Sequence, residues 1–201
     1  MRVTLSRAYE AGGCLSARRL FVAFAVMTGG LTQPLLAMPQ GPSPDVSLHV
    51  ERGVYSVTAR FQVPQPAALV LAVLTDYETI PRFMPDIHTS VVLERADGQA
   101  IVQQEAVSRV MLLLSKRVHL VLEIDEGEDT LRFNDRCGQS FARYQGLWRV
   151  SDQNGRAEVL YQLVAQPSFD VPEFVLKRVL KRNAEQMIEQ LQREIAARSG
   201  R

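Results

Sequence analysis

The chain has few of the residues that mark disulfide-stabilised proteins and common enzyme classes. Its 201 residues include two cysteines and three histidines, which excludes a scaffold of several disulfides and a zinc site built from several cysteines. It also lacks a glycine-rich phosphate loop, a Gly-x-Ser-x-Gly motif and a His-Glu-x-x-His motif. Nucleotide binding, serine-hydrolase chemistry and this type of zinc site therefore lack their usual signatures. We expect no metal and no cofactor, and a non-enzymatic protein is favoured over an enzyme.

The chain also lacks a charge excess of either sign. It carries 23 basic and 22 acidic residues, a net charge of +1, which predicts no general attraction to nucleic acid. Hydrophobic residues make up 46% and charged residues 22% of the chain. These values argue against wholesale disorder and against a polytopic membrane protein. The length fits one ordinary domain with a tail.

The first 37 residues have the pattern of an export signal. Four arginines are followed by an apolar stretch, Leu20–Ala37, which is the order of a secretory signal with a small residue at the cleavage point. Gly29, Gly30 and Pro34 interrupt the stretch, which argues against a stable membrane-spanning helix. We expect cleavage after Ala37 and a periplasmic or secreted protein. The paired arginines fit the twin-arginine export route, and they also fit an ordinary secretory signal. An uncleaved signal that anchors the chain in the membrane is the alternative.

A linker and one domain follow the signal. Residues 38–45 are rich in proline and are interpreted as the linker, and residues 46–201 as the domain. Cleavage would remove Cys14, leaving Cys137 as the only cysteine in an oxidising compartment. We interpret Cys137 as a packed strand residue, and a reactive thiol or an intermolecular bridge is the alternative.

The domain has the pattern of an α+β fold. Apolar and polar residues alternate in segments such as Val54–Val63, which predicts about seven antiparallel strands joined by short turns. The dipeptides Asp97-Gly98 and Asn154-Gly155 indicate two-residue hairpins. Two short helices are expected over Ala67–Leu74 and Tyr77–Phe83, after the first core strand.

A long helix closes the chain. Residues 172–197 contain no glycine and only one proline, at the first position, and their apolar residues recur at helical spacing. Such a helix is roughly 35–40 Å long at 1.5 Å per residue. Its apolar stripe needs a large partner surface, and one curved sheet is the surface available. The sequence therefore predicts a curved antiparallel sheet wrapped around a long C-terminal helix.

Three stretches of sequence carry a resemblance to a known family. Residues 76–85 read Asp-Tyr-Glu-Thr-Ile-Pro-Arg-Phe-Met-Pro, residues 146–150 read Gly-Leu-Trp-Arg-Val, and residues 171–175 read Val-Pro-Glu-Phe-Val. In these stretches and in element order, the chain resembles the polyketide cyclase and coenzyme Q-binding (SRPBCC) branch of the START-like superfamily, which has the helix-grip fold. The resemblance covers Val54 to Ile195. It implies an apolar cavity between sheet and helix, where members bind lipids, sterols, quinones, polyketides or hormones and a minority catalyse cyclisation.

Shared strand and helix faces indicate which residues would line that cavity. Gly146 is expected to leave room on its strand, and the alternative is that all these residues pack as ordinary core. The expected ligand-binding residues are Phe83, Met84, Tyr144, Trp148, Val159, Tyr161, Leu163, Met187 and Leu191.

Several polar residues are candidates for orienting a ligand or for catalysis. Gln103 and Glu105 are expected to face inward. Arg143 and Arg149 either do the same or line the solvated outer face, which is the favoured interpretation. His88 follows the Met-Pro-Asp segment at the expected mouth and is the best of the three histidines as a catalyst, although a surface role is favoured for each of them.

Two segments suggest peripheral contact with a membrane. One is the apolar run that contains Val110, Met111 and Leu112, and the other is the helix start from Phe174 to Arg182, where apolar and cationic residues are interleaved. A buried strand and a solvated helix face are the alternatives.

Three functions follow from these patterns. The first is an exported binding protein for a hydrophobic small molecule such as a lipid or an isoprenoid quinone. The second is a cyclase or dehydratase that uses the same cavity. The third is a protein- or membrane-interaction module with a collapsed pocket.

Overall fold

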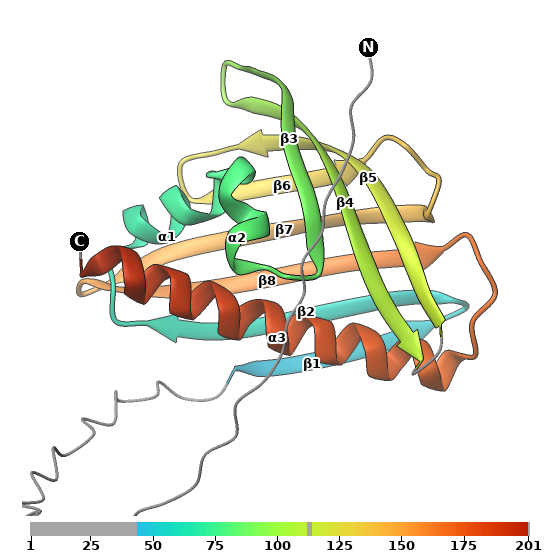
Figure 1. Cartoon of the computed structure of the whole chain (residues 1–201). Coiled ribbons are helices and arrows are strands. Elements are labelled where there is room, and N and C mark those ends of the chain that lie inside the picture. The colour runs from blue at the N-terminus through green and yellow to red at the C-terminus, as the bar shows by residue number, and fades with distance from the viewer. Residues whose placement is uncertain (1–43, 112–113, 201) are drawn as a thin grey trace, which may run out of the picture. The chain divides into compact units, whose positions relative to one another are not determined.

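Eight antiparallel strands form one sheet in the computed structural model, which describes residues 44–111 and 114–200. The strands, shown in Figure 1, are β1 (Asp45–Glu51), β2 (Val54–Val63), β3 (Ile87–Ala96), β4 (Gln99–Met111), β5 (Leu114–Glu126), β6 (Thr130–Asp135), β7 (Phe141–Gln153) and β8 (Arg156–Pro167). The sequence predicted about seven strands, and the described residues form eight. The predicted export signal lies outside the described residues, as does most of the linker.

The strand order in the sheet is β1-β2-β8-β7-β6-β5-β4-β3. The N-terminal hairpin β1–β2 therefore joins the rest of the sheet through the pairing of β2 with β8, the last strand in the chain. The predicted hairpin turns are confirmed. Asp97 and Gly98 have φ angles of 51° and 77°, and Asn154 and Gly155 have 58° and 78°. Positive φ at both central residues is what a tight two-residue hairpin needs, and Asx-Gly pairs adopt it readily.

Two short helical segments follow β2, as the sequence predicted. They are α1 (Ala67–Leu74) and the turn made by η1 (Tyr77–Thr79) and α2 (Ile80–Phe83). The backbone N–H of Ala67, at the start of α1, donates to Oδ2 of Asp152 over 3.4 Å, and Oδ1 of Asp152 accepts from the N–H of Gly155 over 2.9 Å. One carboxylate therefore holds the β7–β8 turn and satisfies a free donor at the helix start.

The long C-terminal helix α3 (Glu173–Ser199) runs across the curved sheet, on the same side as α1 and α2 (Figure 1). Its side chains contact β1, β2 and β4 as well as the two short helices. Ile188, Leu191 and Ile195 are completely buried. They pack with the inward faces of β2 and β8, where buried residues alternate with exposed ones. The prediction of a helix-grip, α+β fold is confirmed.

None of the helices in the described part of the chain is long and apolar enough to span a membrane.

Candidate ligand cavity

Two adjoining cavities lie between the helices and the concave face of the sheet. The α1-side cavity, of about 130 Å³, is lined by residues of α1, α2, β5, β6 and β7 among others. The α3-side cavity, of about 200 Å³, is lined mainly by β4, β5 and the first half of α3. They share six lining residues: Met84, Ile87, Gln104, Tyr144, Tyr161 and Met187. These six side chains therefore surround the junction between the two cavities.

The cavity walls are mostly apolar and rich in aromatic rings. Trp148 packs on Tyr161 with ring centroids 4.3 Å apart, and Phe141 packs on Tyr144 at 4.9 Å. Rigid rings of this kind provide a large apolar area at low entropic cost. An apolar cavity with a few polar groups is the usual form of a small-molecule site. The open cavities weigh against the interaction module with a collapsed pocket.

The structure brings eight of the nine predicted ligand-binding residues to these walls. Val159 is the exception, because its side chain is completely buried in the core of β8 and reaches neither cavity. Whether the other residues contact a ligand stays a prediction. The eight are Phe83, Met84, Tyr144, Trp148, Tyr161, Leu163, Met187 and Leu191.

Gly146 does not leave open space, contrary to the sequence-based expectation. The ring of Phe133, on the neighbouring strand β6, lies directly over Gly146, and the carbonyl oxygen of Gln162 approaches from β8. A Cβ at position 146 would collide with both groups. The missing side chain at Gly146 thus makes room for Phe133, which lines the α1-side cavity, and not for a ligand.

The inward face of β4 carries Gln104, which the sequence interpretation missed. Ala100 and Val102 are buried on this face, and Gln104 follows them into both cavities. The expectation that Gln103 and Glu105 face inward is wrong by one residue. The Nε2 group of Gln104 donates to Oγ of the buried Ser90 over 3.2 Å, so β3 holds this amide in place.

The hydroxyl groups of Tyr144 and Tyr161 face the cavities without a protein partner. Neither forms a hydrogen bond with any residue that the structure describes. In this part of the chain, every polar side-chain atom that lacks a hydrogen-bond partner is accessible to a molecule of the size of water. Both hydroxyls therefore open onto the cavity. Burial raises the pKa of Tyr144 to about 12 and that of Tyr161 well above its usual value. Both are therefore protonated hydrogen-bond donors at neutral pH.

Few charged groups reach the cavities. Among the described residues that line them, Asp86 is the one carboxylate, and none is a lysine, arginine or histidine. His88 is exposed and does not line either cavity, so the structure gives it no catalytic partner there. Arg143 and Arg149 are exposed, as the favoured interpretation required. Within the described residues, no three His, Cys, Asp or Glu side chains gather as a metal site would need.

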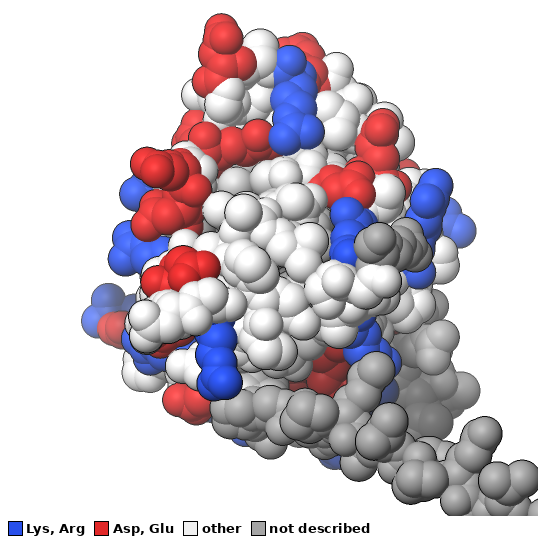
Figure 2. Space-filling view, turned by 90° about the vertical axis from the view of Figure 1, so that its left-hand side faces the viewer, with Lys and Arg blue, Asp and Glu red and all other residues white. Residues whose placement is uncertain are grey.

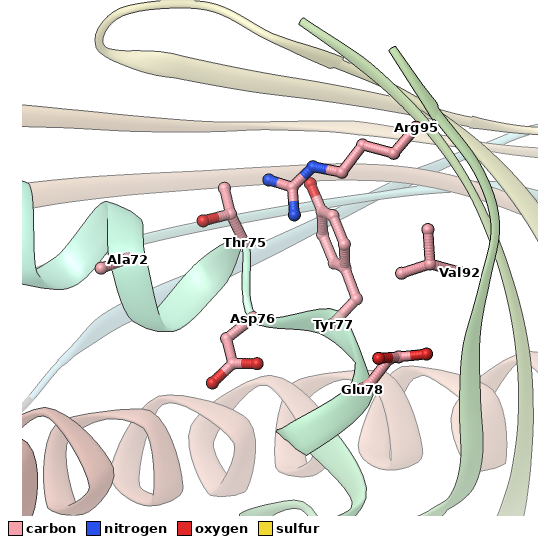
Figure 3. A pocket seen from close by; sticks show the side chains of 7 residues that line it. All are labelled: Ala72, Thr75, Asp76, Tyr77, Glu78, Val92 and Arg95. Carbon is pink, nitrogen blue, oxygen red and sulfur yellow. The ribbon is translucent and has the colours of Figure 1, made fainter.

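A larger hollow of about 320 Å³ lies outside the cavities, on the other side of Tyr77 (Figure 3). The Tyr77 hydroxyl donates to Glu126 Oε1 over 2.7 Å, and Arg95 donates to Oε2 of the same carboxylate over 2.9 Å. Burial and the bond to Glu126 raise the pKa of Tyr77. Asp76 at its rim is bound by Arg198. These polar groups bind one another and hold η1 against the ends of β3 and β5, so the hollow is not the best candidate for a ligand site.

One of the two predicted membrane contacts can be located. Phe174 is 75% exposed, which is unusual for a large apolar side chain. Lys177, Arg178, Lys181 and Arg182 are exposed beside it at helical spacing. The side chains of Val110, Met111 and Leu112 lie outside what the structure describes.

Charge is mixed on the face where α1 and the end of α3 lie. Figure 2 shows acidic and basic side chains interspersed around an uncharged centre. Cys137 is a partly exposed free cysteine whose backbone N–H donates to Asp135 Oδ1 over 3.1 Å.

A cavity held between a curved antiparallel sheet and the last helix is the mark of START-like proteins. The chain belongs to the family described as polyketide cyclase / dehydrase and lipid transport, which matches residues 63–192. Comparison with curated proteins gives no match.

Solved structures agree on the fold. The STAR-related lipid transfer protein from Xanthomonas axonopodis is 17% identical, with a TM-score of 0.62 over 79% of this chain and 97% of that one. The Zhui aromatase/cyclase from Streptomyces sp. R1128 is 15% identical, with a TM-score of 0.63 over 73% of this chain and 96% of that one. Human STARD10 is 12% identical, with a TM-score of 0.60 over 77% of this chain and 73% of that one.

Proposed function

We propose that this protein is an exported, non-enzymatic carrier that binds a hydrophobic small molecule, such as a lipid or an isoprenoid quinone, in the two adjoining cavities. The observation that carries the proposal is the predominantly apolar lining on both sides of the junction around Tyr144 and Tyr161. Binding would be driven by burial of apolar ligand surface, worth about 25 cal/mol per Å² before entropic costs. The family description, which includes lipid transport, and the name of one similar structure, a STAR-related lipid transfer protein, support this class of ligand.

A cyclase or dehydratase is the second candidate, and the convergence of two tyrosines on the junction favours it. A tyrosine with a raised pKa is a weak proton donor, however, and a general acid works best with a pKa near the working pH. The described lining supplies no histidine, and its one carboxylate, Asp86, lines only the α3-side cavity. Binding without chemistry is therefore the better-supported function.

Export is proposed on the sequence pattern of the first 37 residues. Intact-mass analysis of the chain recovered from the periplasm of a host that expresses the full sequence tests it. A mass that corresponds to a start at Met38 supports cleaved export. A full-length mass in the membrane fraction supports the uncleaved anchor instead.

Peripheral membrane contact is part of the same proposal. Leu176, Val179 and Leu180 line the α3-side cavity from the helix start that also carries Phe174 and the four cations. An anionic lipid surface would attract the cations while Phe174 enters the headgroup region. Such a contact would put the cavity next to a source of hydrophobic ligand.

Native mass spectrometry of the exported protein tests the binding function. Protein purified without detergent is sprayed intact, and the bound material is then extracted into organic solvent and identified. A stoichiometric hydrophobic molecule of constant mass supports the carrier. A protein that is empty, and that also takes up no N-phenyl-1-naphthylamine, a neutral fluorescent probe of apolar cavities, would contradict it.

A further inference from the structure

We infer that the ligand is a neutral molecule with an internal hydrogen-bond acceptor, such as a carbonyl oxygen, which Tyr144 and Tyr161 bind while apolar parts on either side fill the two cavities. The inference rests on the proposed carrier function and narrows its ligand class.

The position of the two tyrosines is the first argument. Of the six residues that surround the junction, Met84, Ile87 and Met187 are apolar, and the polar ones are Gln104 and the two tyrosines. These three polar residues lie in the middle of the combined cavity. Beyond them the α1-side walls are apolar except for Tyr77, whose hydroxyl is bound to Glu126, and the α3-side walls combine apolar residues with a few polar ones, Asp86, Asn183, Gln186 and Gln190. Because both tyrosines border both cavities, a ligand atom that they bind has cavity space on either side of it and is internal to the ligand.

The unsatisfied hydroxyls are the second argument. Tyr144 and Tyr161 lie on the paired strands β7 and β8, and both line both cavities at their junction. The side chain of Tyr161 is buried beside the ring of Trp148, and the partly buried side chain of Tyr144 lies beside the rings of Phe141 and Phe133. An unpaired donor in such surroundings is costly, so each hydroxyl needs an acceptor inside the cavity, and a ligand that displaces water from this position has to supply that acceptor itself. An sp² oxygen has two lone pairs and can accept from both donors.

The charge of the lining is the third argument. The cavities have no lysine or arginine among their described lining residues, and Asp86 is the only carboxylate. A fatty-acid carboxylate or a phosphate inside the cavity would lose its hydration without gaining a cation, which is strongly unfavourable. The ligand, or the part of it that enters, is therefore neutral.

Two probes of matched shape test the inference. 5-Nonanone has a central carbonyl between two butyl chains, and 5-methylidenenonane has a CH₂ group in place of the oxygen. Each competes with N-phenyl-1-naphthylamine for the wild-type protein, for the double variant Tyr144→Phe/Tyr161→Phe, and for the control Tyr55→Phe. Tyr55 is a buried tyrosine of β2 that lines neither cavity. The Phe variants keep the ring packing, and their melting temperatures check that they fold.

The quantity to compare is the ratio of the two dissociation constants, ketone to alkene, in each protein. We expect the double variant to raise this ratio roughly tenfold, because net hydrogen bonds of ordinary strength are lost for the ketone alone. Tyr55→Phe should leave it unchanged.

Two other results would be decisive in different ways. If both probes bind and the ratio is the same in the wild type and the double variant, the inference is overturned while the carrier function stands. If neither probe nor the fluorescent competitor binds the wild type, the carrier function itself fails and the inference fails with it.

Discussion

Arg198, the last residue but one of α3, binds Asp76, which lies between α1 and η1. Its Nη1 donates to Asp76 Oδ2 over 2.8 Å, its Nη2 donates to Thr79 Oγ1 over 2.9 Å, and its Nε donates to Glu194 Oε1 over 2.7 Å. One guanidinium therefore joins the end of α3 to the short helical segment whose residues Tyr77, Ile80 and Phe83 line the α1-side cavity.

Replacing Arg198 with alanine should loosen this end of the cavity. We expect a loss of about 1 kcal/mol in the free energy of unfolding, because a partly exposed ion pair with extra hydrogen bonds is worth about that much. Urea denaturation measures it. Arg193→Ala is the matched control, since Arg193 pairs with Glu189 on the exposed side of the same helix. Equal losses in the two variants would show that the bond between Arg198 and Asp76 contributes no more to the free energy of unfolding than the exposed pair of Arg193 and Glu189.

The hydroxyl of Tyr144, which lies among aromatic rings at the cavity junction, should make the protein less stable at high pH. Its pKa is raised from 10.0 to about 12, so between pH 10 and pH 12 the unfolded chain loses a proton that the folded chain keeps. This contribution to stability is fully present below pH 10 and decreases as the pH rises through that window, by about 2–3 kcal/mol in all. Urea denaturation of the wild type and of Tyr144→Phe, at pH 8 and at pH 11.5, should give a smaller decline for the variant. Equal declines would argue that the hydroxyl titrates normally.

Filling the α3-side cavity should weaken ligand uptake without unfolding the protein. Ala106, on the inward face of β4, lines this cavity, and Ala106→Leu would place three more carbon atoms in it. The affinity for N-phenyl-1-naphthylamine should fall roughly tenfold or more, because ligand carbons would be displaced at about 0.8 kcal/mol each. Ala196→Leu, on the exposed face of α3, is the control for added apolar bulk. Unchanged affinity in Ala106→Leu would place the probe elsewhere.

Reversing two charges at the start of α3 should reduce membrane binding. Arg178 and Arg182 are exposed and form no ion pair with the residues that the structure describes, in contrast to Lys177, which pairs with Glu173 over 2.6 Å. Their replacement by glutamate should weaken binding to phosphatidylglycerol-containing vesicles by more than roughly tenfold, since each cation near an anionic surface contributes about 1 kcal/mol.

Vesicle co-sedimentation measures this effect, with Arg156→Glu, at the β7–β8 turn, as the control for a charge reversal away from α3. Added salt should weaken the wild-type interaction. If the double variant and the control bind equally, α3 does not make the contact.

The sequence predicted the fold well where local rules decide it. The Asx-Gly turns, the alternation in β2 and β8 and the uninterrupted helical spacing of α3 each depend on residues close together in the chain. Four of the eight lining residues followed from strand alternation, Met187 and Leu191 from the helical stripe, and Phe83 and Met84 from the segment that resembles the cavity mouth of the family. Val159 shares a face with Tyr161 but lies where the core is filled, and no sequence pattern distinguishes a filled position from an open one.

The missed features depend on register and on distant contacts. In β4, apolar residues occur on both faces, with Val102 on one and Ile101 on the other. The pattern therefore did not decide which face points inward, and Gln104 was overlooked. The bond between Arg198 and Asp76 joins residues that are 122 positions apart, and no local pattern signals such a contact.

The pairing of β2 with β8 has a consequence for how the protein acquires its shape. The first core strand receives its second neighbour only when nearly the whole chain is available, and α3 follows later still. Contacts between such distant segments make folding slow, because a long loop must close before they contribute to stability. Until α3 arrives, the apolar concave face is open to water and to other molecules. A hydrophobic ligand present at that moment would meet the cavity before it has a wall, so loading during folding is available to this topology as well as exchange in the finished protein.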